Sequence, residues 1–259
     1  DDIMARGVTD TADKIRGWIG AVFDYSAMLE ISENNPARLL KNHIPNLPTK
    51  HKPALPREEL PEFYRRLILA TNIERQNKIA IMLIMLVFVR NNELRGGQWQ
   101  EVDFKNKRWI IPAERMKHEK MKPKPALCVP LSDWAIELLQ ELHTLTGHSR
   151  FMFPSRTSVN RHISENTLGK IINEKLGYKG KATPHGFRAV ASSLLYENNF
   201  NGGAIEIQLA HVEEDKTKDS YAYMAEYMPQ RIEFMQWYSD YLREQYNQAL
   251  QMIQESRTV

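Results

Sequence analysis

Apolar residues recur at helical spacing along most of the chain. In residues 10–30 they lie three and four positions apart, which predicts a helix capped by Asp10 or Thr11. The same kind of pattern predicts further helices over residues 36–41, 58–70, 77–89, 132–145, 164–176, 185–198, 204–209 and 229–253. No internal repeat accompanies them. We therefore expect a mainly helical protein.

The longest apolar run is Ile79–Val89, which holds eleven consecutive apolar residues. A helix that crosses a bilayer needs about 20 such residues. The run therefore predicts a helix buried in a protein core, and we expect no membrane association.

The period of the pattern changes between residues 99 and 131. Residues 99–104, 108–111 and 126–131 have strand character, and Lys105, Asn106 and Lys107 form a plausible turn between the first two. These segments predict one small antiparallel β-sheet. The expected fold class is thus mainly α with a small antiparallel β-sheet.

A proline-rich segment separates two unequal parts of the chain. Pro45, Pro48, Pro53 and Pro56 lie close to Lys50, His51 and Lys52, and such a stretch cannot continue a helix. It predicts a basic, extended linker at residues 48–56. We expect one domain in residues 1–47 and a second in residues 57–259.

The charge distribution bears on the kind of molecule that the protein binds, and the cysteine content bears on its cellular compartment. The 259 residues carry a net charge of only +3, but residues 104–130 hold six Lys and two Arg against Glu114 and Glu119. A basic stripe on the sheet suits a polyanion, and a solvated charged loop is the alternative. Cys128 is the only cysteine, which excludes internal disulfides and fits a reducing, cytoplasmic location.

Common cofactor and metal signatures are absent from the sequence. It contains no GxxxxGK, GxGxxG, HExxH or GxSxG motif, so we expect no cofactor and no metal. The histidines outside the motifs below have no metal-ligand spacing and are read as surface or packing residues: His43, His51, His118, His143, His148 and His162. His185 and Arg188, three apart on a predicted helix, share a face and can grip one anion. Alone, that pair discriminates poorly, because chance gives about half a match in such a chain.

Several stretches considered together are far more specific. They are Val89–Gly96, Ile111–Lys117, Pro184–Ala189, Leu209–His211 with Tyr221 ten residues after the histidine, and Met235–Tyr238. In this order the chain resembles the tyrosine recombinases, or phage-type integrases, and most closely the branch encoded by satellite phages and genomic islands. The resemblance covers nearly everything after the linker.

The resemblance implies a role for six residues. Arg90 and Arg188 would clamp the scissile phosphate with His211 as a third donor, His185 would assist proton removal from the nucleophile, Lys117 would protonate the departing 5′ hydroxyl, and Tyr221 would be the nucleophile. Glu93 matches an acidic position that braces the site. Fixed donors aimed at phosphate oxygens stabilise the charge of a five-coordinate transition state without a metal.

Two of these assignments leave alternatives open. Many relatives place the nucleophile nine residues after the histidine, where this chain has Ser220, so Tyr221 is preferred over Tyr223 because the island-type branch tolerates ten. A free phenol has a pKa near ~10 and needs a base or a positive environment to attack. Lys120 or Lys122 replaces Lys117 if the register of the hairpin differs.

The implied function is site-specific recombination that integrates or excises a mobile element. DNA is cut and rejoined through a 3′-phosphotyrosine, which keeps the energy of the broken bond and needs no ATP. The resemblance implies double-stranded DNA as partner, a tetramer on DNA, and an accessory directionality factor or DNA-bending protein. A catalytically inactive DNA-binding relative and a type IB-like topoisomerase are the alternatives.

The resemblance also gives the two parts of the chain an identity. Residues 1–47 would be the C-terminal part of a helical core-binding domain, and residues 57–259 a catalytic domain. The chain begins at Asp1 rather than Met, so we expect it to be part of a longer protein with a further N-terminal DNA-binding domain. The apolar stripe of the last helix predicts core packing, and docking on a neighbouring protomer is the alternative.

Overall fold

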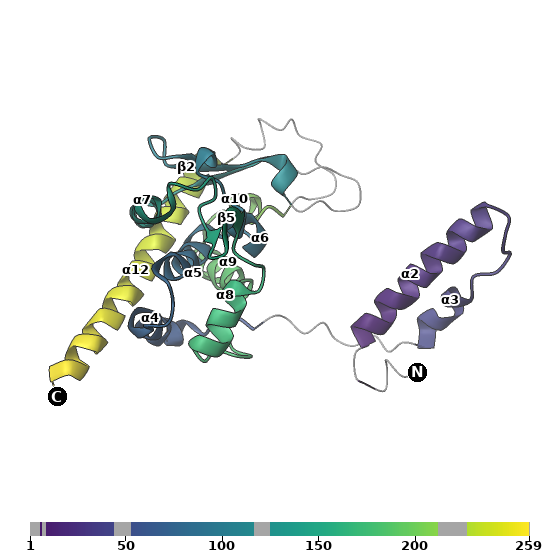
Figure 1. Cartoon of the computed structure of the whole chain (residues 1–259), viewed down its shortest axis with the longest axis horizontal. Helices are drawn as coiled ribbons and strands as arrows, with labels where there is room; N and C mark the ends of the chain where they lie inside the picture. The colour runs from purple at the N-terminus through teal and green to yellow at the C-terminus, as the bar shows by residue number, and fades with distance from the viewer. Residues whose placement is uncertain (1–5, 7–8, 44–52, 117–124, 212–226, 259) are drawn as a thin grey trace. The chain divides into compact units, whose positions relative to one another are not determined.

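The computed structural model describes residues 6, 9–43, 53–116, 125–211 and 227–258 (Figure 1). The chain divides into two compact units, residues 1–51 and residues 52–259.

The first unit contains helix α2 (Thr9–Met28) and the short helix α3 (Pro36–Leu39). Asn35 caps α3 by accepting a hydrogen bond from the Ala37 amide, and its side-chain amide donates to the Gly20 carbonyl and to Asp24. The bond from Asn35 lowers the pKa of Asp24. One asparagine therefore starts α3 and holds it against α2.

Helix α2 confirms the predicted helix, although it begins at Thr9, just before the expected cap. Its apolar side chains are largely open to solvent within the described part of this unit: Trp18 is 69% exposed and Met28 is 80% exposed. The helical pattern thus forms a helix whose apolar face has little to pack against here.

The core of the second unit is built around helix α5 (Arg75–Val87). Every residue of the predicted apolar run Ile79–Val89 is at most 2% exposed. Helices α7 (Asp133–Thr146), α9 (Gly186–Glu197) and α12 (Met228–Thr258) pack against it, and α4 (Leu60–Leu69) packs on α12 (Figure 1). The prediction of a buried helix is confirmed. Among the described helices, none has the length and apolar character needed to span a membrane.

Helix α12 is 31 residues long and packs on its own chain, along α4, α5 and α7. Met235, Tyr238 and Leu242 of the predicted apolar stripe are buried. The predicted core packing of the apolar stripe is confirmed for these residues, whereas Leu250 is exposed. Most of the apolar stripe of α12 therefore packs against helices of its own chain.

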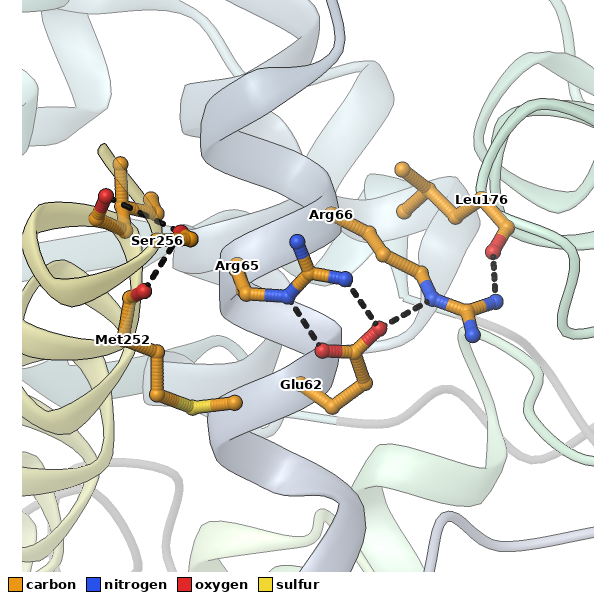
Figure 2. Close-up of polar contacts among 7 residues, drawn as sticks. Glu62, Arg65, Arg66, Leu176, Met252 and Ser256 are labelled. Carbon is orange, nitrogen blue, oxygen red and sulfur yellow. Dashed lines mark hydrogen bonds and ion pairs between the residues drawn. The ribbon is translucent and has the colours of Figure 1, made fainter. Parts of the chain in front are cut away.

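Helix α4 is fastened by a pair of arginines, as Figure 2 shows. Arg65 and Arg66 both donate to the carboxylate of Glu62, and Arg66 also donates to the Leu176 carbonyl. The hydrogen bond from Arg65, with a further bond from Arg66, lowers the pKa of Glu62 to about 2. This cluster ties α4 to the segment that precedes α9.

The predicted sheet forms from β1 (Val102–Asp103), β2 (Arg108–Ile111) and β3 (Leu127–Pro130), all antiparallel, with Trp109 opposite Val129. The expected strand at residues 99–104 is wrong in its first half. Residues 99–101 form a turn of 3₁₀ helix, because the Glu101 carboxylate accepts a hydrogen bond from the Gln98 amide. In the basic stripe, Lys105, Lys107 and Arg108 are exposed.

The expected fold class, mainly α with a small antiparallel β-sheet, is confirmed, but the structure has a second small sheet that the sequence did not predict. A second antiparallel pair forms from β4 (Pro154–Ser155) and β5 (Ser158–His162). Its strand β5 is polar and largely exposed, so it lacks the alternation that marks a half-buried strand. Arg95 of helix α6 (Asn91–Arg95) fastens this hairpin by contacts with His162 and the Ile163 carbonyl.

The remaining predicted helices appear with modified ends. The helix expected at residues 164–176 is a short α8 (Thr167–Lys170) that widens into a π-helical turn at Ile171–Lys175. Helix α10 (Gly202–Gln208) is capped by Asn201, whose side chain accepts from the Ala204 amide. It ends just before His211.

Candidate active site

Arg90 lies in the sharp turn between α5 and α6. Phe88 ends α5 in the left-handed region with φ 59°, which redirects the chain, and Arg90 then caps α6. The Glu93 carboxylate accepts from the Arg90 amide at 2.7 Å and from the Arg90 guanidinium at 3.0 Å. Glu93 is 1% exposed. One buried carboxylate therefore fixes both the backbone and the side chain of Arg90.

Arg115 lies beside the same turn, although the sequence had not singled it out. Its guanidinium donates to the Glu93 carbonyl at 2.8 Å and pairs with Glu101 at 2.9 Å. A Cβ on Gly96 would come within 2.6 Å of this guanidinium, so the glycine leaves the space that Arg115 occupies. Burial lowers the pKa of Arg115.

His185 and Arg188 stand at the start of α9. His185 is the cap of the helix and its carbonyl accepts from the Arg188 amide, so the two side chains lie one turn apart. Between them, Gly186 is the point where residues 53–54 cross the helix, because an added Cβ would overlap the Pro53 carbonyl oxygen. Thr183 stabilises this turn by accepting from the Gly186 amide at 2.9 Å.

Arg188 is 4% exposed and joins the ends of two helices. Its guanidinium donates to the Phe88 carbonyl, at the end of α5, and to the Leu209 carbonyl, at the end of α10, the latter at 2.7 Å. Burial, and next the positive charge of Arg90, lower the pKa of Arg188 to about 10. Two guanidiniums held this close leave a local excess of positive charge that an anion would relieve.

His211 follows a second tight turn, in which Ala210 has φ 50°. The Ala210 carbonyl accepts from the Arg90 guanidinium at 3.4 Å, which places the residue before His211 beside Arg90. The His211 ring pairs through Nδ1 with Glu206 at 2.7 Å, and Tyr196 donates to the same carboxylate at 2.9 Å. The bond at Nδ1 leaves Nε2 as the ring nitrogen available to another partner.

An open cleft of about 810 Å³ runs along these turns. Its lining is rich in cations and amides, with four Lys or Arg side chains against two carboxylates. The lining residues are Arg90, Asn91, Asn92, Glu93, Arg115, Glu165, Asn166, Gly169, Lys170, Asn173, Thr183, Pro184, His185 and Arg188. Most of them lie in or beside α6, α8 and α9, whose ribbons are labelled in Figure 1, and Arg115 comes from the 3₁₀ turn Ala113–Arg115. Such a surface suits an anionic ligand with many hydrogen-bond acceptors.

The structure thus brings Arg90, His185 and Arg188 together in one cleft. His211 is joined to them through the backbone of Ala210 but does not line the cleft. Lys117 and Tyr221 lie outside the described residues, as do Tyr223, Lys120 and Lys122.

Sequence reasoning missed Arg115, Lys170 and Asn173, which line the same cleft. Arg115 falls within the quoted stretch Ile111–Lys117, and its position two residues before Lys117 was the one available signal. Within residues 9–43, 53–116, 125–211 and 227–258, no group of three His, Cys, Asp or Glu side chains is placed to hold a metal ion.

Comparison with known families and proteins gives consistent matches. Residues 55–227 match the family described as "Phage integrase family". The chain is 33% identical to the integrase of Enterobacteria phage P4 over 98% of this chain, and 34% identical to the integrase of Shigella phage Sf6 over 92%. It is 33% identical to the prophage integrase IntS of Escherichia coli K12 over 92%. The chain spans 60% of the length of each of these three relatives.

Solved structures of the same fold are more distant in sequence. The integrase of transposon Tn1549, in complex with a circular intermediate DNA, aligns with a TM-score of 0.64 at 14% identity, over 82% of this chain and 75% of that one. Lambda integrase, as a tetramer bound to a Holliday junction, aligns with a TM-score of 0.61 at 13% identity, over 84% of this chain and 63% of that one.

Proposed function

Since this chain belongs to the phage integrase family, on the branch of the P4-type and prophage integrases, we propose that it is a site-specific DNA recombinase. In this proposal it cuts and rejoins duplex DNA through a 3′-phosphotyrosine, and so integrates or excises a mobile element. The relatives from phages P4 and Sf6 carry the name integrase, and the Tn1549 and lambda neighbours are integrases solved in complex with DNA.

The observation that carries the proposal is the meeting of Arg90, His185 and Arg188 in one open cleft. Arg90 lies nearly 100 positions before His185 and Arg188 in the sequence, yet all three residues line the same cleft. A phosphodiester under attack gains negative charge on its non-bridging oxygens. Two planar guanidiniums, both held in place by buried acceptors, offer paired donors to those oxygens without reorganising.

In the proposed reaction, one bond to phosphorus forms as another breaks. The Tyr221 oxygen attacks the phosphorus while its proton passes to His185 or to solvent, and the bond to the 5′ oxygen breaks as Lys117 donates a proton to it. His211, oriented by Glu206, adds a donor to the phosphate. The reverse step, with a 5′ hydroxyl as nucleophile, reseals the strand and releases the tyrosine.

The proposed partner is double-stranded DNA, and the active assembly is a tetramer on two duplexes. Lambda integrase, a neighbour in fold, has been solved as a tetramer on a Holliday junction. Residues 1–47 are proposed to be part of a core-binding domain and residues 57–259 the catalytic domain. An accessory directionality factor or a DNA-bending protein completes the proposed system.

A nicked suicide duplex tests the function. After cleavage the short fragment that carries the free 5′ hydroxyl diffuses away, so the strand cannot be resealed. The covalent protein–DNA adduct therefore accumulates and is measured on a denaturing gel. We expect an adduct with the parent and with Tyr223→Phe, and none with Tyr221→Phe. Absence of an adduct with the parent, while DNA is still bound, would favour an inactive DNA-binding relative.

A further inference from the structure

A buried arginine and a buried glutamine, at the start of α12 and the end of α10, do not line the cleft. Arg231, on the first turn of α12, and Gln208, at the end of α10, are both 0% exposed. Arg231 donates to the Gln208 side-chain oxygen through Nε at 3.1 Å and Nη2 at 2.8 Å, and Nη2 also reaches the Cys128 carbonyl on β3. A fully buried guanidinium is costly to desolvate, so its retention needs a reason beyond packing.

The pair makes a second bridge between the two chain turns that Arg188 joins. Gln208 donates through Nε2 to the Val87 carbonyl at 3.2 Å, whereas Arg188 joins the next residue of each turn, Phe88 and Leu209. Both bridges connect the end of α5 to the end of α10. The left-handed residues Phe88 and Ala210 lie in the same two turns. A residue other than glycine adopts the left-handed conformation only where the surrounding contacts hold it there.

The pair also joins the two flanks of residues 212–226, which contain Tyr221. Gln208 lies three residues before His211, and Arg231 lies ten residues after Tyr221. Their direct contact therefore sets the distance between the flank that carries His211 and the flank that begins α12. Neither residue lines the cleft, so any effect on chemistry must act through these flanks.

We propose that Arg231 and Gln208 are positioning residues for strand cleavage, which hold the two flanks of the nucleophile-bearing segment in register with the phosphate-binding arginines. This inference rests on the proposed function. It assigns them no contact with DNA. Their loss should slow formation of the phosphotyrosine bond while leaving DNA binding nearly intact.

Arg231→Lys is the sharpest variant, because one ammonium keeps the buried charge but cannot reproduce the two-nitrogen contact with Gln208. Gln208→Glu is the second. It keeps an acceptor for Arg231 and removes the donor to Val87. Arg243→Met is the matched control, since Arg243 lies on the same helix, is partly exposed and pairs with Glu137 away from the cleft.

The measurement is the single-turnover rate of adduct formation at saturating suicide duplex, beside the Kd for the same duplex and the thermal unfolding curve. We expect Arg231→Lys to cut the rate at least tenfold, with the Kd changed less than about twofold and cooperative unfolding retained. Arg243→Met should keep the parental rate. If Arg231→Lys fails to unfold cooperatively, Gln208→Glu decides by the same criteria.

A second substrate separates positioning of the nucleophile from help to the leaving group. A 5′-bridging phosphorothiolate expels a thiolate that needs no proton, so it should rescue Lys117→Ala but leave the ratio of parental to Arg231→Lys rates unchanged. An Arg231→Lys rate of adduct formation within twofold of the parental rate would overturn the inference, and so would a slower rate that the change in Kd explains fully. Either result would leave the proposed function standing. A parent that forms no adduct overturns both.

Discussion

The buried carboxylate of Glu93 makes the strongest local prediction. Glu93→Gln keeps the shape of the side chain but presents an amide group to one of the two Arg90 donors, so one charge-assisted bond is lost. Bonds to charged groups contribute about 1.5–3 kcal/mol, and a buried donor left unpaired costs a similar amount. We therefore expect a loss of about 2–3 kcal/mol, which in a unit of this size lowers the Tm by about 4–12 °C.

The same substitution should increase the rise in Tm that a bound anion causes. The charge of Glu93 raises the pKa of Arg188 while that of Arg90 lowers it, so removing Glu93 leaves the two guanidiniums less compensated. Sulfate, compared with chloride at equal ionic strength, should raise the Tm of Glu93→Gln more than that of the parent.

The assay is thermal unfolding of the whole chain, followed by circular dichroism over a sulfate titration. Glu62→Gln is the control for the sulfate response, because it makes the same chemical change at a partly exposed carboxylate on α4 whose arginine partners do not line the cleft (Figure 2). A Tm for Glu93→Gln within about 2 °C of the parent, with an unaltered sulfate response, would refute the reasoning.

Three further predictions concern single positions. Because the pKa of Glu62 is lowered from 4.5 to about 2 in the folded chain, its stabilisation is full above pH 4.5 and is lost as the pH falls towards 2, so urea unfolding should show parent and Glu62→Gln converging over that range. Gly186→Ala should lower the Tm because the added Cβ overlaps the Pro53 carbonyl, whereas Gly169→Ala, which meets open space on α8, should raise it slightly; a stabilised Gly186→Ala would contradict the crossing at this point. Lys117→Ala should slow cleavage of an ordinary suicide duplex by at least tenfold and regain parental speed on the phosphorothiolate substrate, and equal defects on both substrates would exclude proton donation by this lysine.

Most helices could be predicted because their apolar spacing matches their burial. The run Ile79–Val89 is the clearest case, since it is apolar on every side and every side is covered. The strand expected at Trp99 failed because a contact made by the Glu101 side chain closes a turn there. The hairpin of β4 and β5 was missed because its exposed residues lack alternation.

Some residues of the candidate site could be predicted from the sequence, and others could not. Arg90, His185 and Arg188 were identifiable from the family motifs, and the cleft contains all three. Arg115 depends on the gap at Gly96, and the Arg231–Gln208 pair depends on two helix ends meeting in space. Contacts of that kind are set by tertiary packing, and no spacing along the chain marks them. The roles of Lys117 and Tyr221 stay predictions.

The central claim is that one phosphate is held by Arg90 and Arg188 while it is joined to Tyr221. A crystal structure of the chain trapped on a nicked suicide duplex tests it directly. The account predicts continuous density from the Tyr221 oxygen to a 3′ phosphate whose free oxygens lie within hydrogen-bond distance of both guanidiniums. A phosphate bound elsewhere, or a covalent bond to another side chain, would contradict it.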